Sequence, residues 1–221
     1  LAAEILLGLG NSFISGADTA LMYDSLLEVN KEDRFLKYEG RSISIGNFAE
    51  AAAGVLGGFL AAISFRYPAY AQVIVAFLAI PFAISLTEPS THKDRLKSSW
   101  KSIFKVVHYS LIEHKTLRTH IIYSSTIGVS TLMMAWLAQP FLKEIGINMK
   151  NYGLIWALLN IIVGVFAFRA HYIEKRFTEL RSLFLIGFIT VTTYFFIGIH
   201  MSYLSLLILF LFYANRGYAT P

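Results

Sequence analysis

The sequence has no cysteine among its 221 residues. Disulfide bonds and metal sites built on thiolates are therefore excluded. Charged residues are also scarce, at 15% of the chain, whereas a soluble domain normally has about 25%. Because 56% of the residues are hydrophobic, the composition indicates a protein that lies in a lipid bilayer.

The motifs of several enzyme classes are missing as well. The sequence contains neither an HExxH zinc motif nor a glycine-rich phosphate loop, which argues against a metalloenzyme and against ATP-driven chemistry. Ser130 and His200 are predicted to lie at different membrane depths, too far apart to act as a serine-protease pair. The sequence therefore predicts no catalytic residues, no metal site and no cofactor.

The net charge of +5 does not indicate a nucleic-acid partner, because the basic residues are unevenly distributed. Fifteen of the 19 Lys and Arg residues lie in or beside three polar segments, and only three lie in the polar segments predicted on the opposite side. Such an asymmetry places the basic segments in the cytoplasm. It predicts that residues 28–39, 88–118 and 171–181 are cytoplasmic and that the first residue is on the outer side.

Residues 88–118 are the only long run in the chain that a bilayer could not hold, and they carry seven basic residues. Apolar residues recur there at helical spacing and lysines occupy the opposite face, a pattern typical of a helix at a membrane surface. A calmodulin-target helix shows the same pattern, but the apolar segments on both sides favour the membrane surface. The run divides the chain into residues 1–87, a connector at 88–118, and residues 119–221.

Three apolar segments precede this connector and four follow it, each near the roughly 20 residues that cross a bilayer. The fold class predicted is an all-α polytopic bundle, with a charged loop at 28–39 between the first two spans. No initiator Met is present and both ends lie inside apolar segments, so we expect a piece of a longer protein. The spans are expected at about 2–27, 42–65, 70–86, 119–142, 153–170, 182–200 and from 203 onward.

Three ionisable residues are expected inside these spans, where a charge near the bilayer centre costs at least about 2.5–3.5 kcal/mol. Glu50 is interpreted either as a protonated carboxyl held within the bundle or as a group that takes up and releases a proton. The same two interpretations apply to Asp18. Arg216 stays charged at any depth, so it needs a carboxylate, a cluster of carbonyls or an anionic ligand. Asp24 and Arg41, near the cytoplasmic ends of their spans, are candidates for a conformational latch.

Several motifs resemble those of the bacterial major facilitator superfamily, a group of membrane transporters. SGADTALMYDSL (15–26) and GRSISIGNFAEAAAGVLGG (40–58) are similar to the family's fourth and fifth helices. WLAQPFLKEIGI (136–147), followed by NYGLIWALLN (151–160) and the basic EKR loop, is similar to its seventh and eighth helices. NRGYATP (215–221) resembles the middle of helix ten. The seven spans would then be helices four to ten of a twelve-helix (6+6) fold. The sequence departs from proton-coupled exporters at Glu4, where they have Arg, and at Ala53 and Gly54, where they have Gly-Pro.

The resemblance implies a secondary active transporter that moves a small molecule by alternating access. Transport would be coupled to protons, and drug or metabolite efflux is the activity expected. The protein would be a monomer in the bacterial inner membrane. Either Glu50 or Asp18 would carry the proton, so a proton or other ion gradient would drive transport. A seven-helix receptor or sensor is the alternative, but E/DRY and NPxxY are absent. The cavity residues expected from the family's central helices and from the polar stripe of the second span are Asn11, Ser15, Asn47, Ser124, Gly128, Thr131, Gln139 and Arg216.

Overall fold

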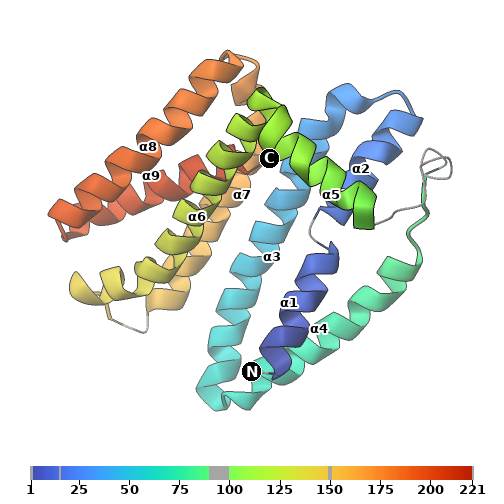
Figure 1. Ribbon diagram of the computed structural model, residues 1–221. Helices are drawn as coiled ribbons and strands as arrows, with labels where there is room; N and C mark the ends of the chain where they lie inside the picture. The colour runs from blue at the N-terminus through green and yellow to red at the C-terminus, as the bar shows by residue number, and fades with distance from the viewer. Residues whose placement is uncertain (1, 15, 90–99, 149–150, 221) are drawn as a thin grey trace.

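The computed structural model of the chain describes residues 2–14, 16–89, 100–148 and 151–220. Every regular element in this part is helical. Figure 1 shows two groups of helices, with α1 to α4 on one side and α6 to α9 on the other. These are called the N-terminal and the C-terminal group. The helix α5 lies in the connection between them.

The first predicted span is not one helix. It consists of two helices, α1 (Ala2–Ile14) and α2 (Ala17–Glu28), with Gly16 between them at a φ of 81°. This left-handed conformation ends a helix, and glycine adopts it without a steric penalty. The prediction of a continuous helix over 2–27 is therefore wrong at this point.

The loop predicted at 28–39 is shorter than expected. A single turn of 3-10 helix at Glu32–Arg34 leads directly into α3 (Phe35–Ile63). The Phe35 ring packs edge-to-face on Tyr23 of α2, with ring centroids 5.5 Å apart. The helix α3 thus begins before residue 42, where the sequence placed the start of the second span. After α3, the chain turns into α4 (Arg66–Ile84), which contains Pro81 in its last turn.

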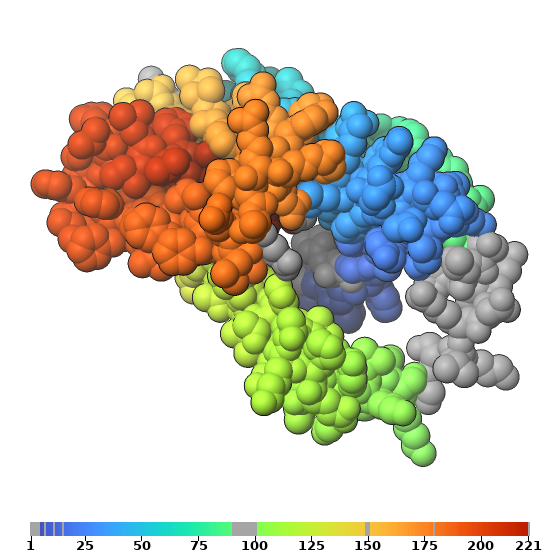
Figure 2. Space-filling model, turned by 90° about the horizontal axis from the view of Figure 1, so that it is seen from above, coloured from blue at the N-terminus to red at the C-terminus, as the bar shows by residue number. Residues whose placement is uncertain are grey.

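The described part of the connector contains the helix α5 (Trp100–His108), followed by a π-helical turn at Tyr109–Glu113. The helix predicted from the spacing of apolar residues is thus confirmed in this part of the connector. Lys93, Arg95 and Lys97 lie outside the described residues. In the space-filling view, the green residues of α5 and of the start of α6 extend away from both groups (Figure 2). An extended position of this kind leaves both faces of α5 available to its surroundings.

The C-terminal group consists of α6 (Lys115–Glu144), α7 (Tyr152–Glu174), α8 (Glu179–Ile199) and α9 (Tyr203–Ala219). Its core lies mainly where α7 packs along α9. The largest side chains that are completely covered come from these two helices, and they include Leu159, Val163, Leu209, Phe212 and Tyr213. Many other apolar side chains on the outer helix surfaces are exposed, as expected for helices that face lipid.

Five helices in the described residues are long and apolar enough to cross a membrane. The two predicted spans outside this set are the interrupted first one and α9, which has 17 residues. The chain is therefore a polytopic α-helical membrane protein. The five helical segments are Glu32–Ile63, Arg66–Ile84, Lys115–Glu144, Tyr152–Glu174 and Leu180–Ile199.

The two groups meet where α3 lies beside α7, near the centre of Figure 1. At one end of this interface, the Ser44 hydroxyl donates a hydrogen bond of 2.6 Å to the Gly164 carbonyl. At the other end, Gly153 lies against the Gly54 carbonyl, with 4.0 Å between that oxygen and an ideal Cβ at Gly153. The two helices are therefore antiparallel and stay close along their length, because small residues let their backbones approach.

Candidate functional site

A cavity of about 360 Å³ lies between α6, α8 and α9. It is lined by Ser124, Gly128 and Thr131 of α6, by Arg216 of α9, and by Thr220 directly after α9, among others. We call it the Arg216 cavity. The structure therefore brings together four of the predicted cavity residues, although α6 and α9 are far apart in the sequence.

The lining of the Arg216 cavity combines one guanidinium group with several hydroxyl groups. Arg216 is half-buried. The Thr131 hydroxyl donates to the Gly128 carbonyl over 2.8 Å, and the Thr220 hydroxyl donates to the Arg216 carbonyl over 2.6 Å. Their oxygens can still accept hydrogen bonds, while the guanidinium can only donate them. The cavity can therefore hold a polar molecule with an acidic group against Arg216.

Gln139, the other described cavity candidate on α6, lies in a second cavity of about 410 Å³. This Gln139 cavity is lined by α6, by Gly54 of α3, and by Tyr152, Gly153 and Trp156 of α7, among others. It thus lies between the two groups of helices. The single cavity expected from the sequence is present as two.

One face of α6 lines both cavities. Ser124, Gly128, Thr131, Ala135 and Ala138 follow one another at intervals of three or four residues, which places them on the same side of a helix. The first three line the Arg216 cavity and the last two the Gln139 cavity.

The two predicted proton carriers lie in separate places. The Asp18 carboxylate is exposed, accepts a hydrogen bond of 2.8 Å from the Thr19 backbone N–H, and lies near Glu39 at the start of α3. Glu50 is also exposed, and it is 11 residues further along α3, or about 16 Å at 1.5 Å per residue. Asp18 and Glu50 therefore do not form a carboxylate pair.

Arg216 lies beside Tyr213 on α9. The guanidinium carbon of Arg216 lies 5.7 Å from the centroid of the Tyr213 ring, and the Trp156 ring centroid lies 6.2 Å from it. Sequence reasoning missed Tyr213. Its spacing of three residues before Arg216 places both on one side of α9, which is the signal that was available.

The remaining candidates lie outside both cavities or outside the described structure. Asn47 donates from Nδ2 to the Ile43 carbonyl over 2.8 Å, and it does not line either cavity. Ser15 and the side chain of Asn11 are outside the described residues. Among the residues that the structure describes, no cluster of His, Asp or Glu could hold a metal ion.

The two latch candidates make different contacts. The Arg41 guanidinium lies 5.8 Å from the centroid of the Phe168 ring of α7 and 6.0 Å from that of Tyr38. Arg41 is thus at the interface between α3 and α7. Asp24 is only 4% exposed. The latch remains a prediction for both residues.

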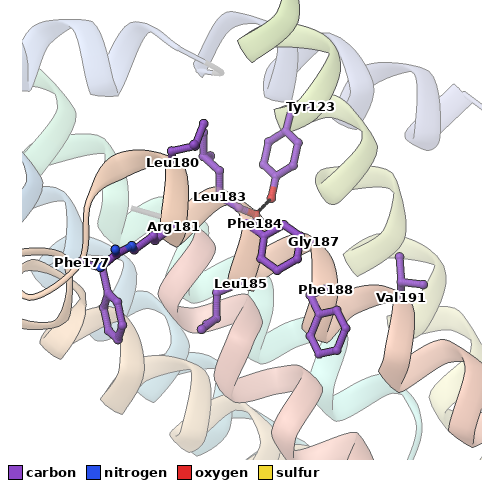
Figure 3. Close-up of a pocket in the computed structure, with 10 residues that line it drawn as sticks. All are labelled: Tyr123, Phe177, Leu180, Arg181, Leu183, Phe184, Leu185, Gly187, Phe188 and Val191. Atoms are coloured by element: carbon purple, nitrogen blue, oxygen red, sulfur yellow. Dashed lines mark hydrogen bonds between the residues drawn. The ribbon is translucent and has the colours of Figure 1, made fainter.

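A larger cavity, about 940 Å³, is an apolar hollow between α6 and α8. Figure 3 shows the Tyr123 hydroxyl at its edge, donating a hydrogen bond to the Leu183 carbonyl, with a length of 2.5 Å. The rings of Phe184 and Phe188 face the hollow and are more than half exposed. A lining of this kind suits hydrocarbon chains, and it has few groups to orient a polar solute.

Comparison with known proteins agrees with this architecture. The family model of the Major Facilitator Superfamily matches residues 2–220, almost the whole chain. No curated protein and no solved structure matches the sequence. Transporters of this family generally work without a cofactor. Since the match spans the entire described bundle, the chain belongs to the Major Facilitator Superfamily and is a membrane transporter.

Proposed function

We propose that the protein is a secondary active transporter that moves a small molecule by alternating access and couples this movement to protons. The observation that carries the proposal is the convergence of Ser124, Gly128, Thr131 and Arg216 on one cavity. In alternating access, two helical bundles rock around a central site. Residues 1–87 and 119–221 would be these bundles, with the connector 88–118 between them.

The position of the two cavities supports this mechanism. The Gln139 cavity lies between the two groups of helices, so rocking about the α3–α7 interface would change its size. The Arg216 cavity lies within the C-terminal group. The substrate would bind beside Arg216 and leave along the face of α6. The direction proposed is export, as in drug or metabolite efflux.

Glu50 is the better candidate for the proton carrier. It lies on α3, one helical turn before Gly54, which lines the Gln139 cavity between the two groups. A change in its charge would therefore be felt across the interface between the groups. Asp18 lies near Glu39, at the start of the same helix, and is the alternative proton carrier.

The test is transport by the protein in liposomes with an imposed pH gradient, using a panel of labelled organic acids, sugars and lipophilic cations. Flux that follows the gradient in the wild type and ignores it in Glu50→Gln would support both the coupling and the residue. Asp18→Asn is the matched control and should keep most of the pH dependence. If flux ignores the gradient in all three proteins, proton coupling is wrong.

We also propose that the protein lies in the bacterial cytoplasmic membrane with residues 28–39, 88–118 and 171–181 on the cytoplasmic side. Because the chain has no cysteine, single cysteines can be labelled selectively. Asp33→Cys should react with an impermeant maleimide only after the cells are opened, and Met201→Cys in intact spheroplasts. The reverse result would overturn the orientation, and the unchanged chain is the blank.

A further inference from the structure

The Arg216 cavity has a second basic side chain, which was not among the candidates predicted from the sequence. His120 of α6 is one of the residues that line the cavity, and it lies one helical turn before Ser124 on the same face of the helix. No Asp or Glu is among the described residues of this lining. The Gln139 cavity, by contrast, has no charged side chain in its described lining. The two cavities thus differ in charge, and the Arg216 cavity is the one suited to an anion.

Hydrogen bonds between the helices fix the order of the residues along this cavity. The bonds join Tyr123 to Leu183, Ser130 to Tyr194, Ser182 to Tyr218, and Thr190 to Asn215. The first two show that α6 and α8 are parallel, and the last two show that α9 is antiparallel to both. His120, near the start of α6, therefore lies at the same end of the cavity as Thr220. Arg216 precedes Thr220 by one helical turn, so it lies about 5.4 Å deeper.

His120 and Arg216 thus offer hydrogen-bond donors at two depths of one cavity. The Arg216 guanidinium lies beside the Tyr213 ring, which is neutral, and a charge removed from water needs a partner of opposite charge. A guanidinium binds an acid group through two parallel N–H bonds. A protonated imidazole donates from both of its nitrogens. A short molecule with an acid group at each end can therefore contact both residues.

The titratable groups of the lining come from two of the three helices. They are His120 and Tyr123 on α6 and Arg216 on α9, while α8 contributes Leu183 and Ile186, which do not titrate. Arg216 stays charged at any pH of interest, and the Tyr123 hydroxyl donates its proton to the Leu183 carbonyl. Histidine is the side chain that changes charge between about pH 5 and 8. The charge of the cavity near neutral pH therefore depends on His120.

We propose that the substrate is a small organic dianion, with one acid group bound by Arg216 and the other by the protonated imidazole of His120. His120 is then a specificity-determining residue, because it separates dianions from monoanions, whereas Arg216 binds both. A volume of about 360 Å³ is within the range of small-molecule sites. Affinity falls as the pH rises, because His120 loses its charge. The inference rests on the proposed function, since it takes the Arg216 cavity as the substrate site.

Equilibrium binding to the purified protein in lipid nanodiscs tests this proposal without requiring transport. The probes are succinate, a dianion, butyrate, a monoanion with the same number of carbon atoms, and succinamide, the neutral diamide. Succinate should bind about tenfold more tightly than butyrate, as expected for one more hydrogen bond between charged groups, and succinamide should not compete.

His120→Gln should lower the affinity for succinate about tenfold and leave that for butyrate unchanged. His120→Lys restores a positive charge and should retain succinate binding. His200→Gln is the matched control, because it changes a histidine at the end of α8 that does not line the Arg216 cavity, and it should bind all three probes as the wild type does.

The pH dependence of binding identifies the charge of His120 as the cause. Between about pH 6 and 8 the wild type should lose affinity for succinate about tenfold, as its histidine becomes neutral. His120→Lys should keep its affinity, since lysine stays charged over this range. The probe titrates identically in both experiments, so the difference between the two proteins belongs to residue 120.

The outcomes separate this inference from the proposed function. Equal affinities of the wild type for succinate and butyrate, or no binding of either, would overturn the dianion site, while flux that follows the pH gradient would still support the transporter mechanism. A His120→Gln protein that binds succinate as the wild type does would overturn the role of His120, and so would an equal loss of succinate and butyrate. Succinate binding with the expected changes, but without gradient-driven flux, would support the site and refute proton coupling.

Discussion

The interfaces of α7 and the cavity face of α6 use glycine in opposite ways. A Cβ at Gly164 of α7 would lie 2.5 Å from the Phe48 ring of α3, and a Cβ at Gly217 of α9 would overlap the Val163 carbonyl of α7. At Gly128 of α6, by contrast, a Cβ would meet nothing within 4 Å. The first two glycines permit contact between helices, and the third leaves space.

This difference separates the parts that hold the bundle together from the parts that can admit a solute. Where two helices approach each other at a glycine, one added methyl group is enough to disturb their packing. Where glycine faces a cavity, a methyl group changes the volume open to a solute and leaves the helix contacts unaltered. Changes at the interfaces should therefore alter stability, and changes at the cavity face should alter transport.

The largest effect on stability is expected from Gly217→Ala. Its Cβ would meet backbone atoms of Val163, which cannot rotate away, so α7 and α9 must separate. Overpacking of this kind costs about 1–3 kcal/mol, or on the order of 5 °C in unfolding temperature for a chain of this size. The matched control is Gly198→Ala, where a Cβ meets nothing within 4 Å. Equal unfolding temperatures for the two variants in detergent would refute the close packing.

Arg216→Gln tests the cavity, where changes should alter transport. The variant removes the guanidinium that lines the Arg216 cavity. Since a hydrogen bond to a charged group contributes about 1.5–3 kcal/mol, substrate affinity should fall about tenfold to hundredfold. The measurement is the concentration dependence of uptake into proteoliposomes. Arg169→Gln, which changes an exposed arginine of α7, should leave the affinity unaltered, and an equal loss in both variants would exclude a specific role for Arg216.

Ser44→Ala should have a smaller effect on stability. It removes the hydrogen bond from α3 to the Gly164 carbonyl of α7, and a typical intramolecular hydrogen bond contributes about 0.5–1.5 kcal/mol. Thermal unfolding should show a decrease of a few degrees. Ser25→Ala removes a bond that stays within α2, from an exposed hydroxyl to the Leu21 carbonyl, and should cause a smaller decrease. The reverse order would mean that the α3–α7 hydrogen bond does not stabilise the interface.

Gly128→Ala should have the smallest effect on stability, within about 0.5 kcal/mol, as is usual for changes without a steric conflict. Its methyl group would nevertheless enter the Arg216 cavity. We therefore expect an unchanged unfolding temperature together with an altered preference between small and large substrates in the liposome assay. A large loss of stability would contradict the open space described at this position.

Much of the helical framework and part of the site followed from the sequence. Hydropathy located α3, α4 and the helices from α6 to α9 to within several residues at each end, because the bilayer requires long apolar segments. The grouping of Ser124, Gly128, Thr131 and Arg216 was also predicted. The break at Gly16 was not, because a single glycine inside an apolar segment is compatible with both a continuous and an interrupted helix.

The sequence by itself determined that the chain is a helical bundle in a membrane, because composition and periodicity are local properties. It also indicated the family, through motifs that lie within single helices. Only the tertiary structure decided that Asp18 and Glu50 are apart, that one expected cavity is two, and that Tyr213 packs on Trp156 of α7. These facts depend on how the helices are rotated and shifted against each other, and that is set by close contacts such as those at Gly164 and Gly217.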